Sequence, residues 1–129
     1  MSKNDMFIVI STSNPDPMYK QVTDQIKDAI AAGSLAPGSK IPSIREMARE
    51  LNISEITIKR AYSDLENEGF ILTRSGMGSF VADVDRQKLR SEKLEEIKKD
   101  LEGMLKAGEK FGITTEDVIR ILKVRRSKK

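Results

Sequence analysis

The side chains available for chemistry in this chain are mainly cations and hydroxyl groups. The 129 residues include no histidine and no cysteine, which removes the commonest general base, thiolate nucleophiles, disulfides and the usual ligands of zinc. Arg45, Lys59 and Arg60 are cations, and an arginine guanidinium can donate paired hydrogen bonds to guanine O6 and N7. Ser43 and Ser54 can cap helices or bind a phosphate. The inventory disfavours most enzyme classes, and we expect no catalytic residues, no metal site and no other cofactor.

The charges are unevenly distributed along the chain. Lysine and arginine number 23 and aspartate and glutamate number 20, which gives a formal net charge of +3. Six of the basic residues lie in residues 120–129, where there is no acid, so the remainder of the chain has a slight acidic excess. Attraction to nucleic acid would therefore come from cations gathered on one face. The basic tail is equally compatible with a solubilising role.

The composition is typical of a folded protein. Charged residues make up 33% and hydrophobic residues 38% of the chain, which fits one modest core. No apolar run approaches the length that spans a membrane, and the first residues lack the pattern of a secretory signal. We therefore expect a cytoplasmic protein with no membrane partner.

The first elements of the chain are predicted from periodicity and turn residues. Residues 7–11 form a short run rich in β-branched side chains, which predicts a strand. A turn over residues 13–17 ends this strand. Apolar residues recur at helical spacing from Met18, and Gly33 ends the pattern, which predicts a helix. Residues 34–42 hold two prolines and a glycine without periodicity and predict a connecting loop.

Two helices joined by a short turn are predicted next. Ser43 stands three residues before Glu46, which is the spacing of a capping box. After residues 51–53, Ser54 caps a longer helix that ends at Gly69. The residues expected to face inward are Ile44, Met47, Ala48 and Leu51 in the first helix and Ile58, Ala61, Tyr62 and Leu65 in the second. This is a helix-turn-helix, whose second helix is free to enter a major groove.

A hairpin and two more helices complete the predicted fold. Residues 70–73 and 79–81 are β-prone and flank the glycine-containing turn 74–78. A charged helix runs from Arg86 to the glycines at 108 and 112, and Thr114, three residues before Asp117, opens a last helix. The apolar residues expected to face inward from that last helix are Val118, Ile119, Ile121 and Leu122. The predicted fold class is α+β, mainly α, with a winged helix-turn-helix over residues 1–82 and a two-helix dimerisation appendage with a basic tail over residues 83–129.

Five short motifs, in this order and at this spacing, resemble the GntR family of bacterial transcription regulators. They read YKQV (19–22), GSLAPG (33–38), IPSIR (41–45), AYSDLENEG (61–69) and GMGSFV (76–81). The remainder after the hairpin is similar to the YtrA-type subfamily, whose members lack the large effector-binding domain of other GntR proteins. The resemblance implies a homodimer in which each recognition helix binds one half of a palindromic DNA operator. It also implies a repressor or dual regulator whose targets include transporter operons, often together with the regulator's own gene.

Helix geometry and the resemblance agree on most residues expected to meet DNA. At about 100° per residue, the side of the second helix opposite Ile58 carries Ile56, Lys59, Arg60, Ser63 and Asn67, with Thr57 at its edge. The family's contact positions correspond to Arg45, Ser54, Glu55, Ile56, Thr57 and Lys59, with Ser75 and Gly76 in the hairpin turn. The combined set of expected DNA-binding residues is Ser43, Arg45, Ser54, Ile56, Thr57, Lys59, Arg60, Arg74, Ser75 and Gly76.

Each of these residues has a role in binding and a structural alternative. Arg45 suits guanine, Ile56 suits a thymine methyl group, and Thr57, Lys59 and Arg60 suit phosphate oxygens. The glycines of the turn would let the wing backbone approach the minor groove. Alternatively, the cations are ordinary surface charges, the serines are caps only, and the glycines merely suit a tight hairpin.

Glu55 departs from the family, in which many members have arginine at the first turn of the recognition helix. A carboxylate there meets the positive end of the helix dipole, whereas phosphates would repel it. Glu55 therefore stabilises the helix away from DNA, pairs with Lys59 four residues later, or accepts a hydrogen bond from cytosine N4. We favour the first two because the helical wheel places Glu55 toward the buried side.

The helix that follows the hairpin has a one-sided apolar seam, which predicts an interface between two copies of the chain. The seam would leave apolar surface in water in a monomer, and pairing two copies buries it. Its residues are Leu94, Ile97, Leu101, Met104 and Leu105.

Two other functions stay open at this point. One is an effector-sensing regulator with a ligand site at the C-terminal helices, although the roughly 47 residues after Ala82 are few to enclose a pocket. The other is a winged-helix protein-interaction module, because a fold does not fix a function. A steep salt dependence of binding to random duplex DNA would favour DNA binding over the interaction module.

Overall fold

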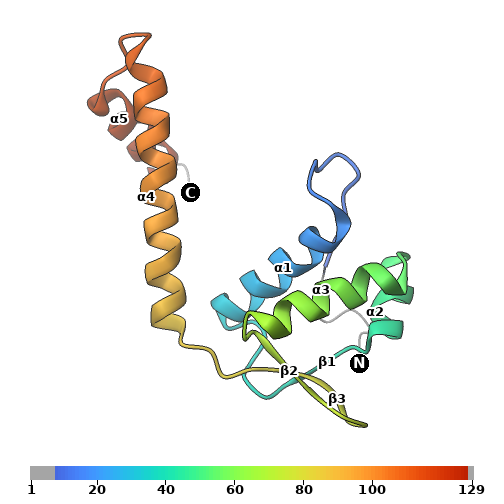
Figure 1. Ribbon diagram of the computed structural model, residues 1–129. Coiled ribbons are helices and arrows are strands. Elements are labelled where there is room, and N and C mark those ends of the chain that lie inside the picture. Colours follow the sequence, from blue (N-terminus) through green and yellow to red (C-terminus); the bar gives the residue numbers. More distant parts are fainter. Residues whose placement is uncertain (1–7, 128–129) are drawn as a thin grey trace. The chain divides into compact units, whose positions relative to one another are not determined.

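The computed structural model describes residues 8–127 and divides after Arg86 into two compact units (Figure 1). Among the described residues, the first unit holds three helices and a three-stranded antiparallel sheet, and the second consists of two helices. In chain order the elements are α1 (Met18–Ala32), β1 (Lys40–Ile41), α2 (Ile44–Leu51), α3 (Glu55–Asn67), β2 (Ile71–Arg74), β3 (Gly78–Val81), α4 (Arg86–Glu109) and α5 (Thr115–Ser127). The predicted fold class, mainly helical with a small sheet, is confirmed.

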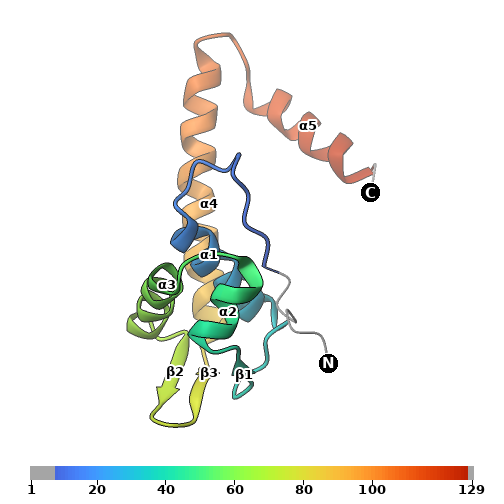
Figure 2. The same ribbon diagram turned by 90° about the vertical axis from the view of Figure 1, so that its right-hand side faces the viewer.

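The core of the first unit lies between its three helices and one face of its sheet (Figure 2). Its largest fully buried side chains are Val22 and Ile26 from α1, Met47 from α2, Ile58 and Leu65 from α3, and Ile41, Ile71 and Val81 from the sheet. Fully burying one aliphatic side chain of this size is worth about 1.5–3 kcal/mol. This cluster therefore fixes α3 against both α1 and the hairpin.

The helices of the helix-turn-helix begin where the sequence predicts. Ser43 Oγ accepts the Glu46 N–H at 3.1 Å, and the Glu46 carboxylate accepts the Ser43 N–H at 2.9 Å, so the capping box is formed. Ser54 Oγ accepts the Thr57 N–H at 3.2 Å and caps α3. Asn52 ends α2 in the left-handed conformation, with φ of 56°, which asparagine tolerates better than most residues. The two helices are thus separated by a turn of only a few residues.

The sheet has the order β1-β3-β2, so β1 pairs with the second strand of the hairpin. Lys40 lies opposite Phe80, and Ile41 lies opposite Ser79. The prediction of a continuous loop over residues 34–42 is therefore wrong at Lys40 and Ile41. Two residues are too few to show a period, and their pairing partner is distant in the sequence.

The segment before α1 is held by glutamine side chains. The strand predicted for residues 7–11 is absent from residues 8–11, and Phe7 lies outside the described residues. The Gln25 amide donates to the Val9 carbonyl at 2.8 Å and accepts the Val9 N–H at 3.0 Å. The Gln21 amide does the same for Ser11, at 3.1 Å and 2.9 Å. Side-chain amides thus satisfy the backbone groups that a neighbouring strand would have satisfied.

Replacing Gln21 with leucine is expected to lower the free energy of unfolding by about 1–3 kcal/mol. The Gln21 side chain is buried and bonds the backbone of Ser11 and the Asp16 carbonyl, so all these groups lose a partner. Denaturant unfolding measures the change. Gln25→Leu is the matched control and should cost less, because the Val9 groups that Gln25 binds are exposed to water. Equal losses in the two variants would contradict this role for burial.

The second unit has no buried residue among residues 87–125. α4 carries its apolar seam on the surface, with Leu94 and Ile97 about half exposed at 48% and 51%. The expectation that α5 turns its apolar residues inward is wrong for Ile119, Ile121 and Leu122, which are exposed, and Val118 is only half-buried. The two helices diverge from their connecting turn (Figure 2), so they enclose no core between them.

The start of α5 follows the predicted capping box. The Thr114 N–H donates to the Asp117 carboxylate at 2.9 Å, and the Asp117 N–H donates to Thr114 Oγ1 at 3.2 Å. The hydrogen bond from the Thr114 backbone holds the pKa of the Asp117 carboxyl below its usual range.

Within the described range, every helix is too short or too polar to cross a bilayer.

Candidate nucleic-acid interface

The exposed side of α3 is set by the side that the helix buries. Ile58, Ala61 and Leu65 are fully buried in the core. The opposite side carries the exposed residues that the helical wheel predicts, namely Ile56, Lys59, Arg60, Ser63 and Asn67. Ile56 is 80% exposed, and it is therefore available to pack against a thymine methyl group.

A buried tyrosine links α3 to the start of α2. Tyr62 Oη donates a hydrogen bond to the Pro42 carbonyl at 2.7 Å. Burial raises the pKa of the Tyr62 phenol above its ordinary value, so it remains a donor. Because Pro42 directly precedes the cap of α2, this bond fixes the position of α2 relative to the recognition helix.

α2 presents two arginines on its exposed side. Arg45 lies in the first turn, and among the described residues no acid forms an ion pair with it. Arg49 is also exposed and follows one turn later, on the same side of the helix. Sequence reasoning missed Arg49, although its spacing of four residues from Arg45 was a usable signal.

The predicted hydroxyl ligands of α2 and α3, Ser43, Ser54 and Thr57, take part in helix caps. The Ser43 backbone N–H donates to the Glu46 carboxylate, which holds the pKa of that carboxyl below its usual range. Ser54 Oγ and Thr57 Oγ1 lie 2.8 Å apart in a second hydrogen bond. Their structural role is therefore confirmed, and contact with phosphate stays a prediction.

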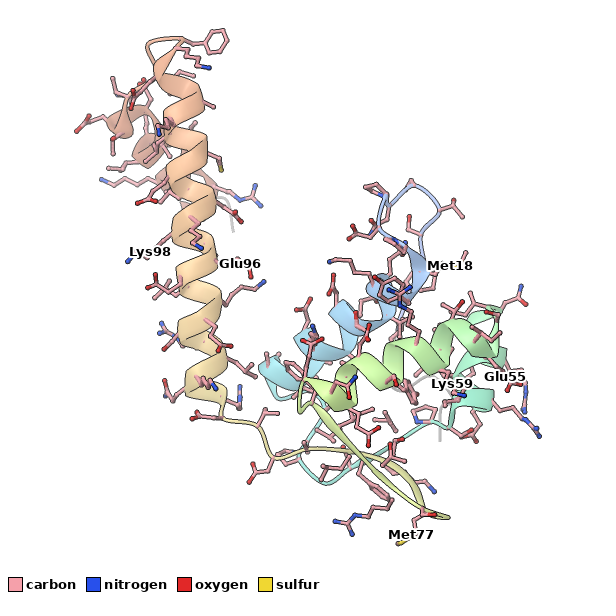
Figure 3. All side chains as sticks on the ribbon, in the orientation of Figure 1. Met18, Glu55, Lys59, Met77, Glu96 and Lys98 are labelled. Atoms are coloured by element: carbon pink, nitrogen blue, oxygen red, sulfur yellow. The ribbon has the colours of Figure 1, made fainter. Side chains whose placement is uncertain are left out.

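The two cations of α3 differ in how they are held. The Arg60 guanidinium carbon lies 3.7 Å from the centre of the Tyr19 ring on α1, a cation–π contact. Lys59 forms no ion pair or aromatic contact with any described residue, and Figure 3 shows it on the exposed side of α3. Lys59 is therefore free to reach an external anion, whereas Arg60 is anchored against the first helix.

The hairpin turn brings Arg74, Ser75 and Gly76 to its tip. The Met77 N–H donates to the Arg74 carbonyl at 2.9 Å, and Gly76 has φ of 75°, which suits glycine. Figure 3 shows Met77 at the tip, where it is 58% exposed. The Arg74 guanidinium carbon lies 5.7 Å from the centre of the Phe80 ring.

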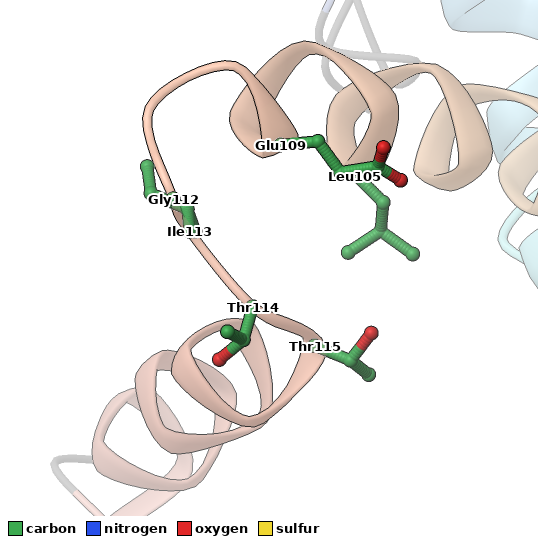
Figure 4. A pocket seen from close by; sticks show the side chains of 6 residues that line it. All are labelled: Leu105, Glu109, Gly112, Ile113, Thr114 and Thr115. Carbon is green, nitrogen blue, oxygen red and sulfur yellow. The ribbon is translucent and has the colours of Figure 1, made fainter.

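A shallow hollow lies at the turn between α4 and α5 (Figure 4). It has a volume of about 300 Å³ and is lined by Leu105, Glu109, Gly112, Ile113, Thr114 and Thr115. The hollow is open to solvent, whereas ligand sites usually enclose most of the ligand. It gives little support to the alternative in which an effector binds at the C-terminal helices.

Comparison with known proteins identifies the family. Residues 18–81 match the model of bacterial regulatory proteins of the gntR family. The chain is 31% identical to the HTH-type transcriptional repressor YtrA of Bacillus subtilis over 109 residues, which cover 84% of each protein. The chain belongs to the GntR family. The recognition from sequence motifs is confirmed, and the similarity to YtrA extends beyond the winged helix into the C-terminal helices.

Solved structures of GntR regulators are similar to this fold. A GntR family transcriptional regulator from Listeria monocytogenes matches with a TM-score of 0.69 and 31% identity, covering 85% of this chain and 96% of the other. The DNA-binding domain of AraR in complex with operator ORE1 matches with a TM-score of 0.51 and 33% identity, covering 57% of this chain and 89% of that domain. This GntR protein is a DNA-binding transcription regulator and not an enzyme.

Glu55, at the position where many GntR proteins have arginine, is exposed. The placement toward the buried side is therefore wrong, because the first residue of α3 lies beyond the part of the helix that packs on the core. Among the described residues, Glu55 and Lys59 also form no ion pair. Of the three roles, helix stabilisation and hydrogen bonding to cytosine fit an exposed carboxylate.

Glu55→Gln is expected to tighten binding to operator and random DNA by similar factors, with no change in base preference. The substitution removes a negative charge that phosphates repel and keeps a side chain of the same shape. Fluorescence anisotropy with both duplexes measures the two factors. A loss of discrimination at a C·G pair would instead show that Glu55 accepts a hydrogen bond from cytosine N4.

Proposed function

We propose that this protein is a homodimeric repressor that binds a palindromic operator through its helix-turn-helix and wing. The observation that carries the proposal is the exposed side of α3 together with Arg45, where cations and an apolar side chain face solvent on a rigid scaffold. α3 would enter the major groove, and the hairpin would lie beside the minor groove. Arg45 would read guanine, and Lys59 would pair with phosphate.

The C-terminal helices support the homodimer. Their apolar residues are exposed in a single chain, and a two-fold interface would bury the same seam on both copies. We assign residues 1–82 to DNA binding and residues 83–129 to dimerisation. Two copies related by a two-fold axis present two recognition helices, which is why the operator should be a palindrome.

The sign of regulation is supported by the relatives. YtrA of Bacillus subtilis is named a transcriptional repressor, and a bound dimer that covers a promoter excludes polymerase. The proposed targets are transporter genes and the protein's own gene. A reporter driven by each candidate promoter should rise when the gene is deleted, and a fall would instead indicate an activator.

Salt dependence tests whether the protein is a DNA-binding regulator or an interaction module. Binding to a random duplex is measured at several salt concentrations, and the same protein is used to select sequences from a random pool. We expect log affinity to fall steeply with log salt and the selected sequences to share one two-fold symmetric motif. Salt-independent binding, or a motif without symmetry, would overturn the proposal.

A further inference from the structure

The outer face of the sheet brings together two cations that are far apart in the sequence. The register places Lys40 of β1 and Leu72 of β2 opposite Phe80 of β3, and Arg74 of β2 opposite Gly78 of β3. Since side chains alternate between faces along a strand, these five residues share one face. The opposite face carries the buried Ile41, Ile71 and Val81. Lys40 and Arg74 therefore stand on the solvent side of the wing, on either side of β3.

Lys40 extends over Gly78. A Cβ atom built on Gly78 would lie 2.8 Å from Lys40 Cε and 3.5 Å from its Nζ. Any side chain at residue 78 would therefore displace the lysine, and the φ of 113° at Gly78 further favours glycine. Because Gly78 has no side chain, the Lys40 ammonium group can lie across β3 near the turn.

Arg74 extends over the same strand from the other side. Its guanidinium carbon lies 5.7 Å from the centre of the Phe80 ring, and Phe80 is the next residue of β3 on that face. Among the described residues, neither Lys40 nor Arg74 forms an ion pair with an acid. The strands and the turn between β2 and β3 contain no acidic residue. Two cations without an ion-pair partner thus lie over one strand, and an acid that interacts with Lys40 is Glu46 at the start of α2.

We propose that Lys40 and Arg74 form a clamp for one backbone phosphate of double-stranded DNA on the outer face of the wing, with Gly78 kept bare for Lys40. This inference rests on the proposed DNA-binding function. Two neighbouring cations repel each other in the free protein, and a phosphate between them removes that repulsion. A phosphate contact positions the wing without reading bases. Sequence reasoning could not find this pair, because Lys40 joins Arg74 only through the pairing of β1 with β3.

Salt titration of the variants tests the clamp. Lys40→Gln, Arg74→Gln and the double variant are titrated against the selected operator and a random duplex by fluorescence anisotropy. For each single variant, the loss of affinity for the operator should equal its loss of affinity for the random duplex. The double variant should lower the slope of log affinity against log salt by about 1, the value for a single phosphate. Lys99→Gln, on the exposed side of α4 opposite the apolar seam, is the matched control and should leave the slope unchanged.

Two further measurements make the outcome specific. Lys40→Arg keeps the charge and should retain the wild-type slope. Gly78→Ala should weaken DNA binding by a larger factor in the wild type than in a Lys40→Ala background, because displacement of the lysine adds to the backbone strain that φ of 113° imposes in both backgrounds. Circular dichroism checks that each variant is folded.

The failure of the clamp and the failure of the proposed function give different results. A wild-type slope in the double variant overturns the clamp while DNA binding stands. A slope that falls by about 2 indicates two separate phosphate contacts and also overturns it. If the wild-type protein binds duplex DNA without salt dependence, the proposed function itself is overturned.

Discussion

Leu101→Asp is expected to convert the protein from a dimer to monomers. Leu101 lies in the apolar seam of α4 and, at 38%, is less exposed in the single chain than Leu94, Ile97 or Met104 of the same seam. In a two-fold interface the substitution appears in both copies, so two carboxylates would be buried without partners. An unpaired buried charge costs about 3–5 kcal/mol, which corresponds to a rise in the dimer dissociation constant of more than about 100-fold.

Sedimentation velocity measures this change, with Lys99→Gln as the matched control. That substitution also makes the charge more negative by one, and helix geometry places it on the opposite side of α4. We expect the control to remain a dimer and both variants to keep the helical content of the wild type. If Leu101→Asp also sediments as a dimer, the interface lies elsewhere on the chain.

Loss of the dimer should also reduce operator binding. When two recognition helices are joined, the second binds as an intramolecular event, which typically gains about 10²–10⁴ in affinity. The monomeric variant should lose a factor of this size on the full operator and much less on a half-site. Equal losses on both duplexes would mean that the aspartate damages the winged helix itself.

Helix caps and the buried side of α3, which depend on neighbouring residues in the sequence, were predicted correctly. The capping boxes of Ser43 with Glu46 and of Thr114 with Asp117 are both formed, because each needs only a serine or threonine and an acid three residues later. The buried side of α3 follows from helical periodicity in the same way. The helix-turn-helix could therefore be located from the sequence.

Features that depend on distant partners were missed. Residues 8–11 have the composition of a strand, yet their partners are the side chains of Gln21 and Gln25 on α1. The strand at Lys40 and Ile41 exists because β3 pairs with it. Periodicity along one segment contains no information about such partners, which is why the second cation of the wing face was also missed.

In the candidate site, too, features set by neighbouring residues were predicted and contacts between distant residues were not. Exposure of Ile56, Lys59 and Arg60 was predicted, but the contact of Arg60 with the Tyr19 ring was not, because it joins α3 to α1. Glu55 was wrongly placed toward the buried side, because the helical wheel assumes that α3 packs on the core along its whole length, including its first residue. Errors of this kind concentrate at helix ends and between helices.

Arg45→Ala is expected to weaken operator binding by about 1–3 kcal/mol, or about 5- to 150-fold. Arg45 projects from the first turn of α2, whose start is fixed by the capping box and by the bond from Tyr62 to Pro42. A guanidinium carried by a helix that is fixed in this way can donate two parallel hydrogen bonds to guanine O6 and N7. The loss should therefore be concentrated at one base pair, where the preference for guanine becomes flat.

Lys59→Ala is the comparison that separates base contact from general charge. Lys59 is a point charge without the planar fork of arginine, so its loss should weaken operator and random DNA by equal factors and lower the salt slope by about 1. Competition with operators that each carry one altered base pair measures both effects. If Arg45→Ala also weakens every sequence equally, Arg45 binds phosphate, and base reading then falls to the exposed side of α3, where Ile56 is the first residue to test.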